Sequence, residues 1–169
     1  MNNYKVAINK GNRKIVIVGA GICGLYLAWK LAEQKHKVTV FERKGTIGKE
    51  ICSGLFSERI LKLIPESKKL IENQIDYCLI HFPKKTLKII FARKFFVMSH
   101  SRLDNLVAGF AQKSGAEIIL NSPISSLPTG YDHVIGCDGA NSFTRKNLGM
   151  PEPDYRLAIH RRKELSRLP

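Results

Sequence analysis

The sequence has 169 residues, 44% of them apolar and 25% charged, and 28 Lys and Arg residues against 14 Asp and Glu residues give a net charge of +14. The length suits one domain, and the composition excludes collagen-like and low-complexity chains. The charge favours an anionic partner, such as a phosphorylated cofactor, nucleic acid or an acidic membrane surface, although general solubility explains it equally well. Nucleic acid is not expected, because the basic segment 84–102 lacks the aromatic pattern of a nucleic-acid reader and no helix-turn-helix or zinc-finger spacing occurs.

The first elements in chain order are a strand, a glycine turn, a helix and a second strand. After a polar lead over residues 1–12, the β-branched run KIVIV (14–18) predicts a buried parallel strand. LYLAWKLAEQK (25–35) repeats apolar residues at helical spacing, and KVTVFE (37–42) predicts the next strand, which completes a βαβ unit. The uncharged stretch 15–29 is not expected to be a membrane anchor, because spanning a bilayer takes about 20 residues.

The middle of the chain predicts a short helix and an antiparallel insertion. SERILKLI (57–64) predicts a helix that has Ser57 as its N-cap and ends at Pro65. Residues 75–98 then alternate as in antiparallel strands, with the turn PKK between the first two. The expected strands are 76–82, 86–92 and 94–98.

The last part of the chain returns to helix and parallel strand. Residues 101–115 share an apolar helical face, and Gly115 predicts the helix stop. The expected strands that follow are 116–120 and 133–139, then a short helix and a basic tail over 151–169 without a periodic pattern. The fold is therefore expected to be α/β, a Rossmann-like parallel sheet over residues 13–150 with an antiparallel β insertion at about 75–98.

The turn after the first strand carries the string G-x-G-x-x-G, at Gly19, Gly21 and Gly24. In this strand–turn–helix context the first glycine permits the tight turn, the second lets the backbone approach a pyrophosphate, and the third lets helix and strand pack closely. The free N–H groups at the helix start then face the anion. We therefore predict a dinucleotide-binding site; the alternative is a tight turn with no ligand.

Glu42 ends the second strand, where a dinucleotide fold places an acid against the ribose hydroxyls of adenosine. An acid at this position disfavours a 2′-phosphate and so excludes NADP from this site. Glu42 could instead be a solvated acid at a strand end. Neither the glycines nor Glu42 separates FAD from NAD.

The thiols and imidazoles suggest no metal site. Cys23, Cys52, Cys78 and Cys137 lie far apart without a C-x-x-C pair, so four thiols in a reducing, cytoplasmic compartment are expected. The histidines show no ligand spacing.

Three further segments resemble one family. ERKGTIGKEICSGLFSERILKLIP is similar to the segment after the second strand in geranylgeranyl reductases, flavoproteins related to the aromatic-ring monooxygenases and flavin halogenases. SRLDNLVAGFAQKSGAEI resembles the Arg-x-Leu/Phe-Asp-x-x-Leu helix of that larger group, and GCDGANSFTRKNLG resembles its D-G-x-x-S-x-x-R segment. The resemblance covers about residues 13–150. It implies that FAD is the cofactor.

The resemblance also assigns residues to parts of FAD. Gly19, Gly21 and Gly24 would surround the pyrophosphate, and Glu42 would hold the adenosine ribose with Arg43 beside it. Ile124 would contact the adenine through its backbone. The other expected contacts of the cofactor, at its ribityl, pyrophosphate and flavin side, are Cys52, Ser53, Gly54, Arg102 and Asp138.

Each of these assignments has a structural alternative. Arg102 could neutralise Asp104 or a helix end. Ser142 and Arg145, from the D-G-x-x-S-x-x-R segment, could be a helix N-cap and a surface residue of the first turn. Cys52 would need a lowered pKa and access to act, so a packing role is favoured over catalysis, and no catalytic residue is assigned.

The resemblance ends near Met150, whereas members of the family continue with a substrate sheet and a second Gly-Asp motif. The fold is therefore expected to be truncated at the C-terminus, and a second chain is a candidate to complete it. The resemblance implies an oxidoreductase that passes hydride from reduced flavin to an isoprenoid C=C bond in lipid biosynthesis. It also implies a prenyl lipid substrate and a peripheral membrane location. Alternatives are an FAD-dependent monooxygenase or halogenase, and a truncated, non-catalytic nucleotide-binding fragment.

Overall fold

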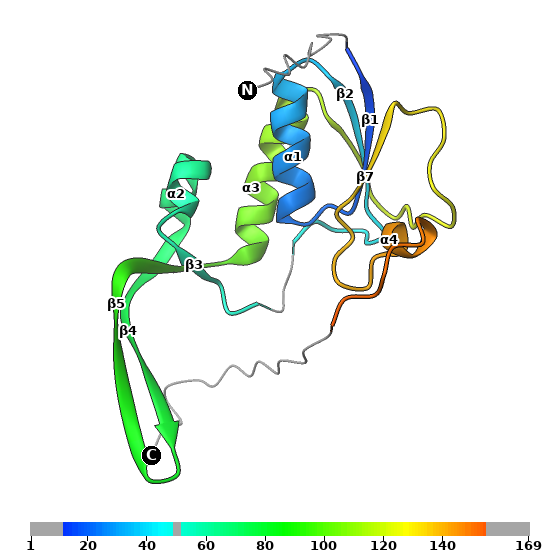
Figure 1. Ribbon diagram of the computed structural model, residues 1–169. Coiled ribbons are helices and arrows are strands. Elements are labelled where there is room, and N and C mark those ends of the chain that lie inside the picture. Colours follow the sequence, from blue (N-terminus) through cyan, green and yellow to red (C-terminus); the bar gives the residue numbers. More distant parts are fainter. Residues whose placement is uncertain (1–11, 49–51, 155–169) are drawn as a thin grey trace, which may run out of the picture. The chain divides into compact units, whose positions relative to one another are not determined.

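The computed structural model describes residues 12–48 and 52–154, which fall into two compact units (Figure 1). The first unit comprises residues 12–45 and 108–150, and the second comprises residues 46–48, 52–107 and 151–154. In these ranges no helix combines the length and the apolar character that crossing a bilayer requires.

The first unit is built on a four-stranded parallel sheet of order β6-β2-β1-β7. Its strands are β1 (Lys14–Val18), β2 (Lys37–Phe41), β6 (Glu117–Ile119) and β7 (His133–Gly136). β1 lies between β2 and β7 and is buried at four of its five positions, which explains its continuous apolar run. The prediction of an α/β fold with a parallel sheet is confirmed.

Helix α1 (Ile22–Glu33) connects β1 to β2 and packs beside the sheet in Figure 1. Its buried residues recur at helical spacing and are Gly24, Leu25, Ala28 and Ala32. Trp29 meets the ring of Phe110, with centroids 4.9 Å apart, which ties α1 to the last turn of α3 (His100–Lys113). The short helix α4 (Phe143–Asn147) follows β7.

The second unit holds a three-stranded antiparallel sheet of order β3-β5-β4. Its elements are β3 (Leu55–Ser57), α2 (Ile60–Leu63), the 3₁₀ helix η1 (Pro65–Leu70), β4 (Ile71–Phe82), β5 (Lys85–Met98) and the first part of α3. Ile64, Leu70 and Met98 are among its buried residues. The antiparallel insertion expected from the sequence is confirmed.

Two expectations for the second unit are wrong. Residues 57–64 do not form one helix, since Ser57 lies in β3 and the four-residue α2 is capped at Arg59 without a side-chain bond. Pro65 ends α2 but also starts η1, because its fixed φ suits the first position of a helix. The strands expected at 86–92 and 94–98 are one strand, β5, whose pairing with β4 shifts register between Ile75 and Tyr77.

The second unit begins at residue 46, well before the insertion expected at about residue 75. The boundary expected at residue 150 stays a prediction. Of the basic tail, residues 155–169 lie outside the described residues.

Candidate dinucleotide-binding site

The turn between β1 and α1 is shaped by glycine at two points. Gly19 has φ +104°, and a Cβ there would lie 2.5 Å from the carbonyl oxygen of Cys137. A Cβ on Gly24 would collide with the carbonyl oxygen of Gly19. Larger residues are therefore excluded at Gly19 and Gly24 because the chain folds tightly onto itself.

Gly21 differs, because the space beside it is open. It is the N-cap of α1, with ordinary backbone angles, and a Cβ built there would meet nothing within 4 Å. Gly21 has no side chain with which to cap the start of α1, and no capping hydrogen bond from an N-cap side chain occurs in this described part of the chain. The first N–H groups of a helix have no intrahelical acceptor, so an anion beside Gly21 would meet several donors and the positive end of the helix dipole.

Glu42 follows β2, and its carboxylate holds two backbone segments. One carboxylate oxygen accepts a hydrogen bond from the amide of Ala20, at 2.8 Å, and the other accepts from the amide of Lys44, at 2.9 Å. The Glu42 carbonyl also accepts from the amide of Ser122, at 2.8 Å, which brings the segment after β6 to the same edge of the sheet. Glu42 therefore joins the glycine turn to the ends of β2 and β6.

Asp138 lies just after β7, at the carboxyl edge of the same sheet. Its Oδ2 accepts hydrogen bonds from the Thr144 amide at 2.9 Å and from the Thr144 hydroxyl at 3.2 Å. Burial raises the pKa of Asp138, but hydrogen bonds from Ser142, Thr144 and its own amide outweigh burial and lower it overall. The charged carboxylate is thereby favoured, and it fixes α4 against the loop after β7.

Ser142 is the N-cap of α4, and its hydroxyl accepts from the amide of Arg145 at 2.9 Å. The Arg145 guanidinium donates to the carbonyl of Ala140, at 2.7 Å. Ser142 is thus the N-cap that the structural alternative expected, whereas Arg145 is half-buried and not a surface residue.

Two thiols lie near the glycine turn. The pKa of Cys137 is raised, first by burial and then by the neighbouring Cys23 and Asp138. A thiol with a raised pKa stays protonated at neutral pH and is a poor nucleophile. Cys137 is thus a packing residue beneath Gly24, while Cys23 is exposed on α1.

The second unit contains Cys52, Ser53, Gly54 and Arg102. Gly54 has φ +69°, its carbonyl accepts from the Met98 amide at 2.9 Å, and a Cβ on it would lie 2.5 Å from the Met98 carbonyl oxygen. The Ser53 hydroxyl accepts from the Leu55 amide at 3.4 Å. The ICSG segment is therefore tied to the last residue of β5.

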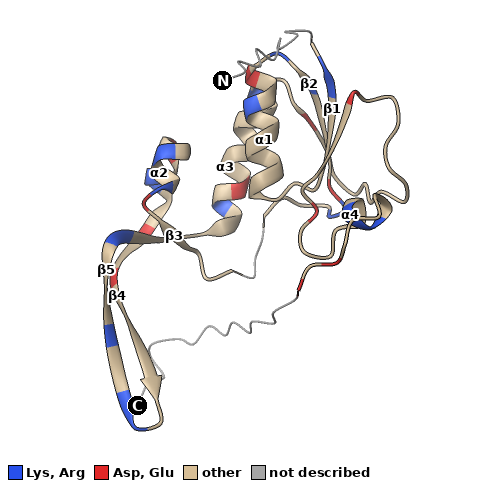
Figure 2. Cartoon of the chain, in the orientation of Figure 1, with Lys and Arg blue, Asp and Glu red and all other residues tan. Residues whose placement is uncertain are grey.

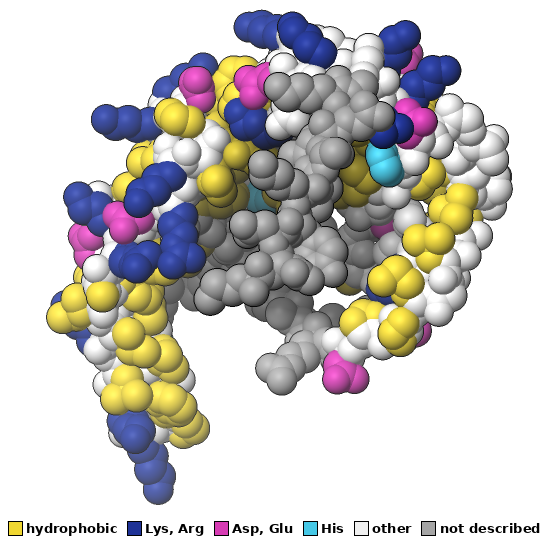
Figure 3. Space-filling model, turned by 45° about the horizontal axis from the view of Figure 1, so that its top comes forward, with side chains coloured by type: hydrophobic (Ala, Val, Ile, Leu, Met, Phe, Trp, Pro, Cys, Tyr) yellow, Lys and Arg dark blue, Asp and Glu magenta, His cyan; other side chains and the backbone are white. Residues whose placement is uncertain are grey.

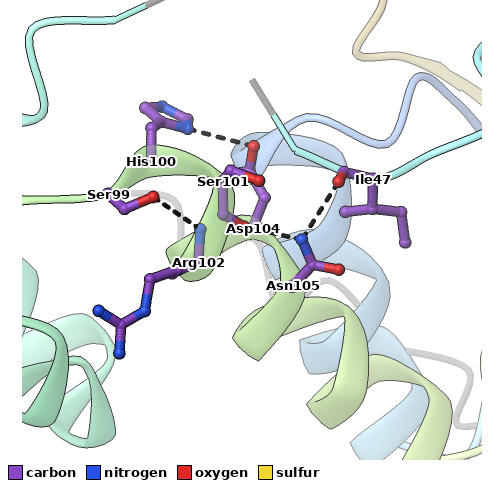
Figure 4. A network of polar contacts seen from close by, with 7 residues as sticks. All are labelled: Ile47, Ser99, His100, Ser101, Arg102, Asp104 and Asn105. Atoms are coloured by element: carbon purple, nitrogen blue, oxygen red, sulfur yellow. Dashed lines mark hydrogen bonds and ion pairs between the residues drawn. The ribbon is translucent and has the colours of Figure 1, made fainter. Parts of the chain in front are cut away.

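Arg102 does not neutralise Asp104. Its amide donates to the Ser99 hydroxyl at 3.3 Å, and its exposed guanidinium lies 3.8 Å from the Glu72 carboxylate. Figure 4 shows this guanidinium pointing away from Asp104, which instead meets His100 at 3.1 Å. Exposed ion pairs of this length contribute little to stability, so the guanidinium stays available for an anion.

The first unit brings Gly19, Gly21, Gly24, Glu42 and Asp138 to one edge of its sheet, where open α/β sheets bind ligands. Arg43 is exposed beside Glu42, and Ile124 is half-buried in the segment after Ser122.

Sequence reasoning missed Ser99 and the His100–Asp104 pair, although Ser99 has the residue type and position of an N-cap. In the described ranges no three His, Cys, Asp or Glu residues are grouped to hold a metal ion.

Comparison with known proteins supports a dinucleotide-binding fold. The profile described as "NAD(P)-binding Rossmann-like domain" matches residues 17–60, which contain the glycine turn, α1 and Glu42. The "uncharacterized protein in nifH2 5′ region" of Methanosarcina barkeri is 25% identical over 170 residues, covering 85% of this chain and 91% of that protein.

Solved structures share the same fold. PqsL of Pseudomonas aeruginosa, a probable FAD-dependent monooxygenase, superposes with a TM-score of 0.67 at 17% identity, covering 88% of this chain and 48% of PqsL. A geranylgeranyl bacteriochlorophyll reductase-like protein of Thermoplasma acidophilum superposes with a TM-score of 0.57 at 23% identity, covering 69% of this chain and 32% of that protein. The chain therefore spans about a third to a half of these two structures. The chain therefore shares with these two structures a Rossmann-like α/β fold, and the profile match lies on its glycine turn.

Proposed function

We propose that this chain is the FAD-binding part of an oxidoreductase of the geranylgeranyl reductase type. One observation carries the proposal: the open side of Gly21 adjoins an uncapped helix start, and the Glu42 carboxylate is bonded to the adjoining residue, Ala20. Together they offer donors for a diphosphate and acceptors for a ribose.

The residues of this edge fit FAD. A carboxylate has about four acceptor positions, and the described bonds to Ala20 and Lys44 use two of them, so Glu42 can still accept from ribose hydroxyls. Its negative charge opposes a 2′-phosphate. FAD is favoured over NAD by the resemblance of three further segments to flavoproteins, and the name of PqsL, a probable FAD-dependent monooxygenase, agrees with this.

The residues of the second unit are proposed to hold the other end of the cofactor. Cys52, Ser53 and Gly54 would bind along its ribityl chain, and the Arg102 guanidinium would pair with a phosphate. Asp138 would lie near the cofactor as a fixed carboxylate. When reduced, bound FAD would supply hydride to an isoprenoid C=C bond. The residues of this chain would bind and orient the FAD.

A second polypeptide portion is proposed to complete the flavin pocket. The chain spans about a third to a half of the two solved structures, so two-thirds to a half of their length has no counterpart in the match. A flavin pocket needs walls that exclude water, and those walls would come from that portion.

A monooxygenase is the second candidate, because the superposition on PqsL covers more of this chain than the reductase-like structure does, 88% against 69%. Reduced flavin would then react with O₂ instead of a C=C bond. A nucleotide-binding fragment without activity is the third candidate.

The test is flavin binding followed by turnover. The purified chain should show flavin absorbance, or should quench the fluorescence of added FAD, while NAD and NADP compete poorly. After anaerobic reduction, reoxidation by a prenyl diphosphate identifies a reductase, and reoxidation by O₂ with product hydroxylation identifies an oxygenase. A folded chain without affinity for FAD, even when the remaining portion of a longer relative is added, would exclude the flavin proposal.

A further inference from the structure

The outer half of the β4–β5 hairpin has two faces of different character. From Tyr77↔Ile90 to Phe82↔Lys85 the residues pair one to one, and directly opposed side chains share a face. One face, which we call the apolar face, consists of Cys78, Ile80, Phe82, Leu87 and Ile89, with Lys85 at its end.

The opposite face is mixed. It carries Tyr77, Leu79, His81, Thr86, Lys88 and Ile90. His81 and Thr86 are hydrogen-bonded at 2.9 Å, and the Lys88 ammonium lies 4.1 Å from the centroid of the Tyr77 ring. Polar groups on this face thus have partners within the hairpin.

The apolar face is exposed. Ile80, Phe82, Leu87 and Ile89 are each 40–47% accessible. Among the described residues, β3 pairs with 95–97, at the base of β5, and leaves the outer half of the hairpin uncovered. Figure 3 shows hydrophobic side chains gathered along this hairpin. A contiguous exposed apolar surface of this kind marks an interaction site, since water contact with it is unfavourable.

The same part of the hairpin is basic. Lys84, Lys85 and Lys88 lie at its outer end, and residues 77–90 contain no Asp or Glu. Figure 2 marks Lys and Arg positions near the tip of the hairpin, and Figure 3 shows basic side chains there, beyond the hydrophobic ones. A partner must therefore accept apolar side chains and offer negative charge beside them.

We propose that the outer half of this hairpin binds the surface of an anionic lipid membrane. A lipid surface offers acyl chains to the apolar face and anionic headgroups to the lysines, whose long stems reach outward from an apolar environment. Burying the unpaired backbone N–H and C=O groups of the hairpin edges in hydrocarbon would cost free energy. The hairpin therefore lies in the interfacial layer and does not cross the bilayer. This inference does not depend on the identity of the cofactor.

The test is flotation of the full chain with vesicles of phosphatidylcholine, with or without phosphatidylglycerol. Binding is expected to vesicles that contain phosphatidylglycerol and to weaken as NaCl is raised, because salt screens the lysines. Equal binding to neutral vesicles, or binding to neither, would overturn the proposal.

Charge variants separate the hairpin from the overall charge. K84E/K85E/K88E is expected to lower the vesicle partition coefficient by about a hundredfold or more. K35E/K37E/K113E, which changes the net charge equally at exposed positions of the first unit, is expected to change it much less. Equal losses in the two variants would assign binding to the general charge and overturn the proposal.

Matched apolar variants test the face. I80S/I89S on the apolar face is expected to weaken binding about tenfold or more, whereas L79S/I90S on the opposite face retains most of it. Circular dichroism and urea midpoints check that all variants fold. A dimer in sedimentation that I80S/I89S abolishes, without vesicle binding by the parent chain, would assign the face to a second copy and overturn the membrane proposal.

Discussion

Gly21 and Gly24 stand three residues apart, yet a side chain would meet different surroundings at each. Gly24 has no room, because its Cβ position is taken by the Gly19 carbonyl, whereas the space beside Gly21 is empty. Lack of space at Gly24 is a demand of the fold itself. At Gly21 the fold itself would accept a side chain, so glycine is required there only if a ligand occupies the open space. Substitutions at the two positions therefore have different expected effects.

Gly21→Ser is expected to leave the free energy of unfolding unchanged within about 1 kcal/mol, or to raise it, because serine is a good N-cap. The same hydroxyl would bond to the helix N–H groups and occupy the space of the diphosphate. The Kd for FAD is therefore expected to rise about tenfold or more, which corresponds to a loss of about 1.4 kcal/mol of binding free energy. Urea denaturation and FAD fluorescence titration measure the two effects.

Gly24→Ser is the matched control and is expected to destabilise the fold by about 1–3 kcal/mol, because its Cβ collides with backbone. If Gly21→Ser bound FAD as tightly as the parent chain, the diphosphate would not lie beside Gly21.

Asp138 gives a pH-dependent prediction. Folding lowers the pKa of Asp138 below its ordinary value of 3.8. The charged carboxylate therefore stabilises the folded protein fully at pH values above 3.8, and this stabilisation is lost as the pH falls through the lower pKa of the folded state. Asp138→Asn is therefore expected to lower stability by about 1 kcal/mol at pH 7, through its bonds to Thr144. The difference from the parent chain should shrink below pH 3.8, measured by urea unfolding across pH. A difference that stays constant with pH would rule out this role for the charge.

At the scale of elements, β5 is buried at two residues of its base, Phe96 and Met98, and exposed towards the tip of the hairpin. Met98 at the end of β5 is 1% exposed, while Ile90 near the middle is 75% exposed. β5 is one continuous strand because its backbone stays extended and paired with β4 on both sides of the register shift between Ile75 and Tyr77. Its stability therefore comes from the base, and the outer half is held mainly by pairing within the hairpin.

Met98→Ala is expected to destabilise the protein by about 2–5 kcal/mol, because it leaves a cavity among buried residues. Ile90→Ala, the exposed counterpart on the same strand, is expected to change stability by no more than about 0.5 kcal/mol. Chemical denaturation of both variants decides the matter; similar losses would mean that the outer half is packed in solution.

At the scale of the whole molecule, the net charge of +14 acts against the folded state. Like charges repel more strongly in a compact chain, and salt screens this repulsion. The pairs Lys30–Glu33, at 3.0 Å, and Arg102–Glu72, at 3.8 Å, are exposed, so their attraction offsets little of this repulsion.

Raising NaCl from about 0.01 M to about 0.15 M is therefore expected to raise the melting temperature by about 2 °C or more. The variant K35E/K37E/K113E, with its lower charge, should respond less. Differential scanning calorimetry at both salt concentrations measures the shift. A fall in the melting temperature on adding salt would show that attractive pairs dominate.

The sequence by itself determined the parallel sheet and the glycine turn, because their signals are local. KIVIV is apolar at every position after Lys14, since β1 is covered on both faces, and G-x-G-x-x-G fixes backbone conformations within six residues. The tertiary structure decided what depends on distant partners. Ser57 has the residue type of an N-cap but pairs with Phe95, and Glu42 bonds to Ala20, contacts that no local pattern encodes. Cross-strand pairing likewise decided which hairpin residues share a face, because register is a property of two strands together.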